Sequence, residues 1–253
     1  MKPYLSVVIP AYNEERNIKK GAPNQVLSYL KRQKYEWEIV FVDDGSQDKT
    51  VQLLEGIAKK EKSTTRTKRI RIIKNPHQGK AATVTTGVLA GNGDIILFTD
   101  MDQSTPIPEI EKFFPFLRKG YDVVIGSRSG RAGAPIIRKL MAWGFVLLRT
   151  LVLRLPLKDT QVGFKAFTRP AVQDIFRSLK IFANQGAIKQ AAVKAGFDLE
   201  VLFIARKHGY KIKEVPVNWR FQGTMRVSPL RDSIEGLRDL LRIRWYALKG
   251  EYR

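Results

Sequence analysis

The stretch Leu5-Ser6-Val7-Val8-Ile9-Pro10-Ala11-Tyr12-Asn13-Glu14-Glu15 contains the pattern from which the fold is predicted. It begins as a short apolar, β-branched run, which is typical of a strand, and continues into acidic residues suited to a helix start. The same order recurs along the first half of the chain. Predicted strands occupy residues 5–10, 38–42, 69–74, 94–99 and 123–126, and predicted helices occupy residues 15–32, 48–60, 80–90 and 108–117.

This β-α-β-α order predicts an α/β fold, with a mostly parallel sheet covered by helices on both faces. In the second half of the chain we expect strands at residues 163–167 and 210–219, and a helix at 198–208. Two more helices, 136–155 and 228–248, combine basic residues with large apolar ones. In such sheets, ligands bind outside the carboxyl ends of the strands. The polar residues that follow the strands therefore become candidates for a site.

The charge of the chain is unusual. It has 45 Lys and Arg against 24 Asp and Glu, a net charge of +21. Such an excess implies an anionic partner, which could be nucleic acid, a phosphorylated substrate or an acidic membrane surface. The chain has no cysteine, which excludes disulfides, thiolate metal sites and cysteine nucleophiles. We expect no signal peptide and no transmembrane helix, because the uncharged stretch 140–148 is much shorter than the about 20 residues needed to span a bilayer.

Three predicted strands end in acidic residues. Glu14 follows the first, Asp43 and Asp44 the second, and Asp100 and Asp102 the fourth. Acids at such positions can serve as turn and helix-cap residues, or can bind a base or ribose. Two carboxylates one residue apart repel each other unless a cation offsets them, and carboxylate oxygens are ligands that Mg²⁺ or Mn²⁺ prefers.

The predicted helix that begins at Lys80 follows a loop containing His77 and Gly79. A lysine at a helix N-terminus is suited to binding phosphate, so Lys80 is a candidate nucleotide-binding residue. The spacing is not that of a Walker loop, which argues against an ATPase. We interpret the loop residue His77 as a solvated or packing side chain rather than a catalyst.

Taken together, these segments resemble the inverting GT-A glycosyltransferases of family 2. More narrowly, they resemble the dolichyl- and polyprenyl-phosphate β-glucosyltransferases and the polyprenyl-phosphate mannose synthases. The resemblance covers nearly the whole chain. Its matching runs are Val7-Val8-Ile9-Pro10-Ala11-Tyr12-Asn13-Glu14-Glu15, Asp43-Asp44-Gly45-Ser46, Asp100-Met101-Asp102, Gly126-Ser127-Arg128, Asp159-Thr160-Gln161-Val162-Gly163-Phe164-Lys165, Gly196-Phe197-Asp198-Leu199-Glu200 and Glu214-Val215-Pro216-Val217-Asn218-Trp219.

The resemblance implies a role for each matching residue. The nucleotide would be bound by Pro10, Tyr12, Glu14, Asp43 and Asp100. Asp100 and Asp102 would bind Mg²⁺ or Mn²⁺ together with the donor diphosphate. Relatives that transfer mannose place a glutamine four residues after the first acid as a third metal ligand. Here that position is Ser104, and Gln103 beside it is the candidate.

The remaining implied residues face the acceptor. Arg128, Arg220 and Arg226 would bind the acceptor phosphate, and Asp102, Arg128 and Asp159 are the candidate catalytic residues. Residues 1–227 would form one GT-A domain, with a nucleotide-binding half (1–99) and a metal and acceptor half (100–227). Residues 228–253 would form a C-terminal basic amphipathic helix. We expect this helix and residues 136–155 to lie in the membrane interface, with their arginines meeting lipid phosphates. The alternative is that they pack on the core, with the arginine side chains extending to solvent.

The function implied is transfer of a hexose, with inversion, from a nucleoside-diphosphate sugar to polyprenyl or dolichyl phosphate. UDP-glucose is the favoured donor and GDP-mannose the other. The enzyme would be cytoplasmic and peripheral, on the cytoplasmic face of an anionic membrane. One alternative is a soluble GT-A enzyme with a saccharide or protein acceptor, which would need a carboxylate base. A nucleic-acid-binding protein is the other, but the chain has no recognised nucleic-acid motif, and acidic strand ends repel a phosphate backbone.

Overall fold

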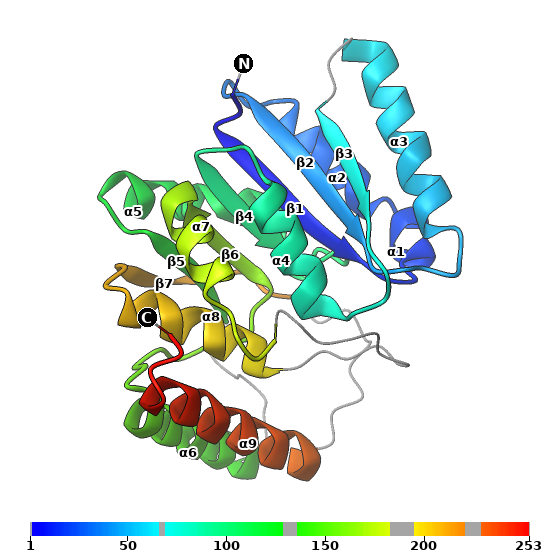
Figure 1. Ribbon diagram of the computed structural model, residues 1–253. Helices are drawn as coiled ribbons and strands as arrows, with labels where there is room; N and C mark the ends of the chain where they lie inside the picture. Colours follow the sequence, from blue (N-terminus) through cyan, green and yellow to red (C-terminus); the bar gives the residue numbers. More distant parts are fainter. Residues whose placement is uncertain (1, 66–68, 129–135, 183–194, 221–228, 253) are drawn as a thin grey trace.

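The computed structural model describes residues 2–65, 69–128, 136–182, 195–220 and 229–252 (Figure 1). Within these residues the strands form a seven-stranded sheet in the order β3-β2-β1-β4-β6-β5-β7. Only β6 runs antiparallel to its neighbours, so the expected mostly parallel α/β sheet is confirmed. The strands are β1 Leu5–Ala11, β2 Trp37–Asp43, β3 Ile70–Lys74, β4 Ile95–Thr99, β5 Val123–Arg128, β6 Phe164–Thr168 and β7 Ile212–Val217.

Alternate side chains of the central strands enter two separate cores, one on each face of the sheet. In β1, Val8 packs in one core while Val7 and Ile9 pack in the other. Because successive side chains of a strand point to opposite faces, a strand that is covered on both sides must be apolar throughout. This explains why β1 and β2 are largely apolar; the exceptions within them are Ser6 and Glu38, which bond each other at 2.6 Å, and the terminal Asp43.

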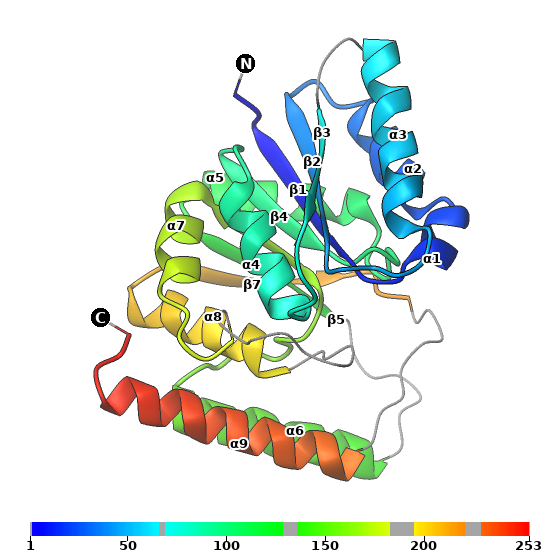
Figure 2. The same cartoon turned by 45° about the vertical axis from the view of Figure 1, so that its right-hand side comes forward.

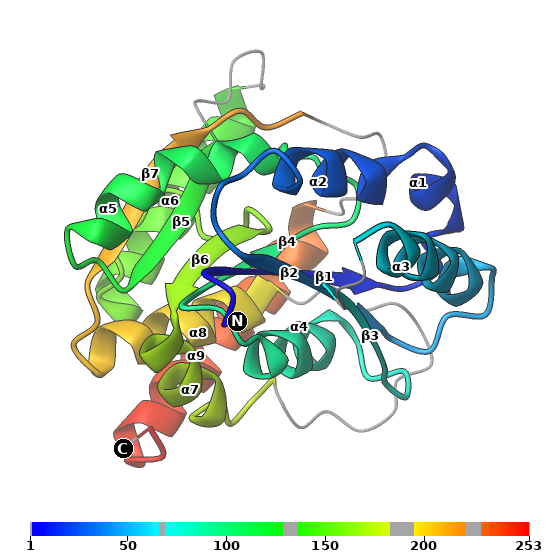
Figure 3. The same ribbon diagram turned by 90° about the horizontal axis from the view of Figure 1, so that it is seen from above.

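Helices cover both faces, as expected (Figure 3). The core that contains Val7 is closed by α1 Glu15–Lys19, α2 Ala22–Leu30, α3 Thr50–Thr65, the 3₁₀ helix η1 Ile107–Lys112 and α5 Phe114–Arg118. The core that contains Val8 is closed by α4 Lys80–Ala90, α7 Arg169–Arg177 and α8 Ala195–Lys207. A Cβ at Gly87 of α4 would lie 2.3 Å from Cγ1 of Val8, so only glycine lets α4 approach the sheet this closely.

Two long helices form a layer of their own. α6 Ile136–Leu153 and α9 Pro229–Leu248 lie side by side below α8 (Figures 1 and 2). A Cβ at Gly236 of α9 would lie 3.0 Å from the ring of Phe145 of α6, which shows how closely the two helices pack. Leu240 and Ile243 of α9 are fully buried in the core below the sheet. In the described part of the chain, no helix combines the length and apolar character needed to cross a bilayer.

The structure differs from the sequence-based expectations in several helices. The helix expected at 15–32 is two helices, because Gly21 takes a left-handed φ of +87° and Pro23 starts a new helix. The helix expected at 108–117 is divided between η1 and α5, where Pro115 lies at the start of α5. Helix α7 was not predicted.

Candidate active site

Three strands deliver their polar residues to one edge of the sheet. The carboxyl ends of β1 and β2 are in register, with Ala11 opposite Asp43, and the parallel neighbour β4 ends directly before Asp100. Parallel strands therefore bring these sequence-distant residues together, as the β-α-β order predicts.

The Asp43 carboxylate is held by the turn that follows β2. One of its oxygens, Oδ2, accepts hydrogen bonds of 3.1 Å from the backbone N–H groups of Gly45 and Ser46. Its other oxygen, Oδ1, is buried and has no hydrogen-bond partner among the described residues. A buried carboxylate oxygen without a donor is costly, so Asp43 is suited to receive an N–H or O–H group from a ligand.

The rings of Tyr12 and His77 stack beside this carboxylate. Their centroids lie 4.1 Å apart and their planes differ by 8°. Asp44 fixes the imidazole, since its Oδ2 lies 2.8 Å from Nδ1 of His77, and it also accepts the N–H groups of Gln78 and Gly79. Nε2 of His77 is buried without a partner in the described structure. The interpretation of His77 as a packing side chain is thus confirmed, although a lone loop histidine carries no sign that its partner will be a strand-end tyrosine.

A cluster of carboxylates and lysines surrounds the end of β4. Nζ of Lys80 lies 2.5 Å from Oδ1 of Asp100. Burial disfavours the charged lysine, but the carboxylates of Asp100, Asp198 and Asp102 together raise the pKa of Lys80 above its ordinary value. Burial, and then the charges of Asp102 and Asp100, raise the pKa of Glu14. A further cation near Asp100 and Asp102 would relieve this repulsion.

Whether this cluster fits a divalent ion depends on how many ligands the chain supplies. Among the described residues, no group of three or more His, Cys, Asp or Glu side chains is arranged to enclose a metal. Asp100 and Asp102 nevertheless offer carboxylate oxygens at one strand end. Two carboxylates suit an ion such as Mg²⁺, which completes its shell with water and substrate phosphate oxygens. The residues present therefore fit a metal that is shared with a diphosphate.

Strand β6 approaches Asp100 through a glycine. The N–H of Asp100 donates to the carbonyl of Gly163 at 3.2 Å, and a Cβ at Gly163 would lie 1.9 Å from Oδ2 of Asp100. Two residues further on, the buried Lys165 bonds Oδ1 of Asp198 at 2.7 Å. The Gly163-Phe164-Lys165 run thus supports the carboxylate cluster from the antiparallel strand.

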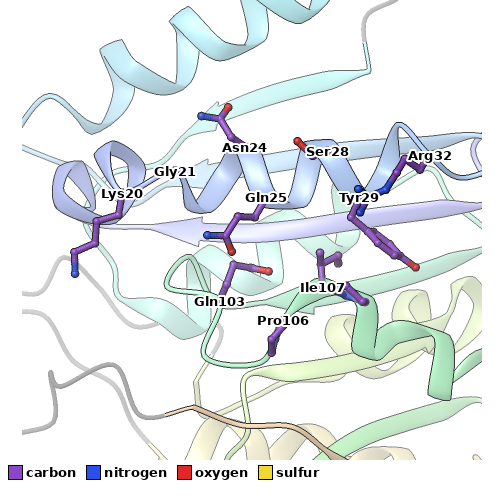
Figure 4. Close-up of a pocket in the computed structure, with 11 residues that line it drawn as sticks. Lys20, Gly21, Asn24, Gln25, Ser28, Tyr29, Arg32, Gln103, Pro106 and Ile107 are labelled. Atoms are coloured by element: carbon purple, nitrogen blue, oxygen red, sulfur yellow. The ribbon is translucent and has the colours of Figure 1, made fainter.

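Gln103 and Asp102 lie in the turn after Asp100. Oδ1 of Asp102 accepts the backbone N–H of Ser104 at 2.8 Å. Gln103 takes a left-handed φ of +51° and donates its side-chain amide to the carbonyl of Asp100. Figure 4 shows Gln103 pointing toward Gln25 of α2, in a groove between α2 and η1 that neither Asp100 nor Asp102 lines. A role for Gln103 as third metal ligand stays a prediction.

On the other side of the cluster, Arg128 at the end of β5 is tightly held. It donates from Nε and Nη2 to the two oxygens of Asp159, at 2.6 and 3.1 Å. Its guanidinium lies 5.4 Å from the centre of the Trp219 ring. Although burial opposes ionisation, the hydrogen bonds and charge of Arg128 lower the pKa of Asp159. Such a carboxylate is an anchor for Arg128 and a poor proton acceptor.

The residues that follow β7 contact both Arg128 and the turn that carries Asp102. The backbone N–H of Arg220, next to Trp219, donates to the carbonyl of Ser104 at 2.8 Å. The backbone of Arg220 thus lies beside the turn that carries Asp102, and Arg128 contacts the preceding residue, Trp219. Pro10 lies in β1 opposite Val42. Arg226 lies outside the described residues.

Comparison with known proteins identifies the family of the chain. The model of glycosyl transferase family 2 matches residues 6–176. Dolichyl-phosphate β-glucosyltransferase of Saccharomyces cerevisiae is 34% identical over 270 residues, which cover 99% of this chain and 77% of the yeast protein. The human protein of the same name is 32% identical over 98% of this chain and 77% of its own length.

Among solved structures, glucosyl-3-phosphoglycerate synthase from Mycobacterium tuberculosis, in complex with Mn²⁺, UDP-glucose and phosphoglyceric acid, has the same fold. The two superpose with a TM-score of 0.60 at 20% identity, over 96% of this chain and 80% of the other. The family match spans more than half of the chain, and the two relatives align with nearly all of it. The chain belongs to glycosyltransferase family 2 and, within it, to the family of the dolichyl-phosphate β-glucosyltransferases.

Proposed function

We propose that this glycosyltransferase moves glucose, with inversion, from UDP-glucose to a polyprenyl phosphate such as dolichyl phosphate. The names of the relatives support the sugar and the acceptor. The observation that carries the proposal is the convergence of two groups of opposite charge at one sheet edge. Asp43, Asp100 and Asp102 form the acidic group, and Arg128 and Arg220 form the basic one.

In this proposal the donor lies over the ends of β1, β2 and β4. The free Oδ1 of Asp43 accepts a hydrogen bond from the nucleoside, beside the stacked rings of Tyr12 and His77. Asp100 and Asp102 hold Mg²⁺ or Mn²⁺, which when bound supplies positive charge to the leaving diphosphate. Lys80, at the N-terminus of α4, adds a second positive charge to the same oxygens. The Mn²⁺ and UDP-glucose bound by the mycobacterial enzyme support this choice of donor and metal.

The acceptor chemistry needs little help from a base. A phosphate monoester is already anionic at neutral pH, so its oxygen can attack the anomeric carbon directly. The protein has to align the two anions and stabilise the leaving group. Arg128 and Arg220, and in our prediction Arg226, bind the acceptor phosphate. A single displacement of this kind inverts the anomeric centre.

The proposal includes a membrane surface, because the acceptor carries a lipid chain. Every large hydrophobic residue that is exposed in the described structure lies on α6 or α9. They are Trp143, Leu147, Leu151, Ile234, Leu237, Leu241, Trp245 and Leu248. Their spacing of three or four residues places them on one side of each helix.

Basic residues accompany this apolar surface. Arg238 and Arg242 are exposed on α9, and Lys249 follows it directly. We propose that α6 and α9 lie in the interface of an anionic membrane, with the apolar side chains among the lipids. The cytoplasmic leaflet carries the anionic lipids that attract such a surface, so we propose a peripheral position on the cytoplasmic face.

The test incubates the purified protein with radiolabelled UDP-glucose or GDP-mannose, anionic vesicles that contain polyprenyl phosphate, and Mg²⁺ or Mn²⁺. We expect label from UDP-glucose in the organic phase, only when metal is present, and its loss in Asp102→Asn. Metal-dependent release of nucleotide without labelled lipid would contradict the lipid acceptor and favour a saccharide or protein acceptor. Labelled lipid from GDP-mannose alone would contradict the choice of donor.

A further inference from the structure

Arg149 is a buried arginine in the helix that otherwise carries the exposed apolar surface. Only 2% of it is accessible to solvent, whereas Trp143 and Leu151 of the same helix are 66% and 70% exposed. A buried arginine is costly unless its donors are used. From the sequence we expect the arginines of this helix to meet lipid phosphates, and for the buried Arg149 that expectation is wrong.

The guanidinium of Arg149 instead binds both ends of the segment that follows the helix. Nε donates to the carbonyl of Leu155 at 3.4 Å, and Nη1 donates to Oγ1 of Thr160 at 3.3 Å. Leu155 and Thr160 are themselves buried. Residues 155–160 are therefore fastened to α6 at their two ends by one side chain.

Strand β7 holds the same segment from another direction. Oε1 of Glu214 accepts the backbone N–H of Asp159 at 2.7 Å, and Oε2 accepts that of Lys158 at 2.8 Å. Burial lowers the pKa of Arg149, and the nearby carboxylates of Glu214 and Asp159 oppose this shift without cancelling it. Asp159 in turn binds Arg128 through both oxygens. A continuous set of contacts thus leads from α6 through Arg149 and residues 155–160 to the Arg128 guanidinium.

We propose that Arg149 is a positioning residue for the transfer reaction, which fixes Asp159, and through it Arg128, relative to helix α6. The inference rests on the proposed function, because it assumes that Arg128 acts on the acceptor phosphate. Arg149 itself touches no reacting atom in this account. Its consequence is that a movement of α6, such as its settling into a lipid surface, alters the position of Arg128 at the sheet edge.

The first readout needs no substrate. Amide hydrogen exchange reports local opening, and the N–H groups of Asp159 and Gln161 are bonded to Glu214 and to Asp159. In Arg149→Met we expect their exchange to be about tenfold faster, while amides of β1 and β2 keep their protection. Thr160→Val, which removes the hydroxyl acceptor, should raise exchange at the same amides. Arg154→Met, directly after α6, is the matched control and should leave the exchange of these amides unchanged.

The second readout compares the kinetics of the acceptor with the binding of the nucleotide. In Arg149→Met, kcat/KM for the acceptor should fall about tenfold, whereas the Kd for UDP with Mn²⁺, measured by calorimetry, should stay as in the wild type. Arg149→Lys retains the positive charge but cannot donate to Leu155 and Thr160 in the same geometry. We therefore expect its kcat/KM to lie between those of Arg149→Met and the wild type. Adding Asp159→Asn to Arg149→Met should cost less than the two single effects combined, because both act through Arg128.

The outcomes separate the two proposals. Unchanged exchange and acceptor kinetics in Arg149→Met would overturn the positioning role while the transferase stands. A parallel loss of UDP binding, or faster exchange throughout the sheet, would also overturn it, because these indicate general destabilisation. Faster exchange confined to residues 155–161, in a protein that glycosylates no lipid, would support the mechanical link and contradict the proposed function.

Discussion

The imidazole of His77 lies parallel to the phenol ring of Tyr12 at a centroid distance of 4.1 Å, and Asp44 holds its Nδ1 at 2.8 Å. This stack forms one wall of the proposed nucleoside site, next to the unpartnered oxygen of Asp43. We predict that His77→Ala weakens UDP binding about tenfold, which corresponds to about 1.4 kcal/mol.

Titration calorimetry with UDP and Mn²⁺ measures this effect. His77→Phe is the matched control, because it keeps an aromatic ring against Tyr12 and loses only the bond to Asp44. It should recover part of the affinity. Equal UDP affinity of the wild type and His77→Ala would show that His77 does not contribute to nucleotide binding.

Gly163 is predicted to be essential for activity rather than for folding. A methyl group there would overlap Oδ2 of Asp100, so Gly163→Ala should displace that carboxylate. We expect kcat to fall by about a hundredfold, the size of effect seen when one electrostatic contact to a reacting group is lost. The matched control is Gly56→Ala in α3, where an added Cβ meets no atom within 4 Å. Full activity of Gly163→Ala would contradict the placement of Asp100 at the diphosphate.

Glu14 gives a prediction for the pH dependence of stability. Its pKa in the folded protein is raised, mainly by burial and then by Asp102 and Asp100. Its contribution to stability is therefore fully present below the unfolded pKa and is lost as the pH rises through the folded pKa. Glu14→Gln removes the charged form, so it should raise Tm at pH 7 and have little effect on Tm at pH 4.

Thermal unfolding of the ligand-free protein across this pH range checks the prediction for Glu14. When Mn²⁺ and UDP are added, the difference in Tm between Glu14→Gln and the wild type at pH 7 should become smaller, because the ion offsets the same negative charges. A gain of equal size at pH 4 and pH 7 would show that ionisation of Glu14 is not its cause.

A second buried carboxylate predicts a stabilising contact far from the site. Glu200 is fully buried, accepts the N–H groups of Lys180, Ile181 and Phe182, and also accepts the hydroxyl of Tyr252. Tyr252→Phe removes one of these hydrogen bonds and keeps the ring. We expect a loss of about 1.5–3 kcal/mol in the free energy of unfolding, as for a hydrogen bond to a charged group.

Urea unfolding measures this loss at Tyr252. Glu200→Gln should be more destabilising, because it weakens the acceptor for three backbone groups at once. The double variant should cost less than the two single effects combined, since both act on one carboxylate. UDP binding should persist in Tyr252→Phe, which separates this contact from the active site.

The apolar surface of α6 and α9 predicts binding to anionic vesicles. Trp143 and Trp245 are 66% and 57% exposed, so their fluorescence should shift to shorter wavelength when vesicles are added. The double variant Leu151→Glu with Leu241→Glu should bind vesicles at least tenfold more weakly, because each leucine contributes about 1.5–3 kcal/mol when buried.

The matched control for vesicle binding is Lys59→Gln together with Lys60→Gln in α3, at the opposite end of the molecule (Figure 1). It changes the net charge by the same two units. Equal loss of binding in the control and in the leucine variant would mean that charge alone drives the association.

Much of this architecture follows from local pattern. The acidic residues after β1, β2 and β4 could be grouped from sequence, because parallel strands share one carboxyl edge. The break at Gly21 could not be placed, since the flanking segments are each amphipathic and continue the same helical pattern. The order β4-β6-β5, with β6 antiparallel, depends on contacts between residues 40 to 73 positions apart.

The inner contacts of the site were harder to predict. Arg149 and Arg154 look alike in the sequence, yet one is buried and the other is exposed, because only the packing of α6 on residues 155–160 distinguishes them. His77 is recognisable only from the ring of Tyr12, which lies 65 residues earlier. Pairings of this kind are set by tertiary structure and leave no periodic signal in the chain.

The exposed apolar surface has a consequence for how the protein is made. Its two halves, α6 and α9, are separated by 75 residues of chain, and most of its exposed side chains belong to the later helix. The surface is therefore completed only after residue 248 has been synthesised and α9 has packed against Phe145. Because Leu240 and Ile243 of α9 are part of the core, the surface and that core are completed in the same step, and a chain that has not finished folding does not yet carry the whole surface.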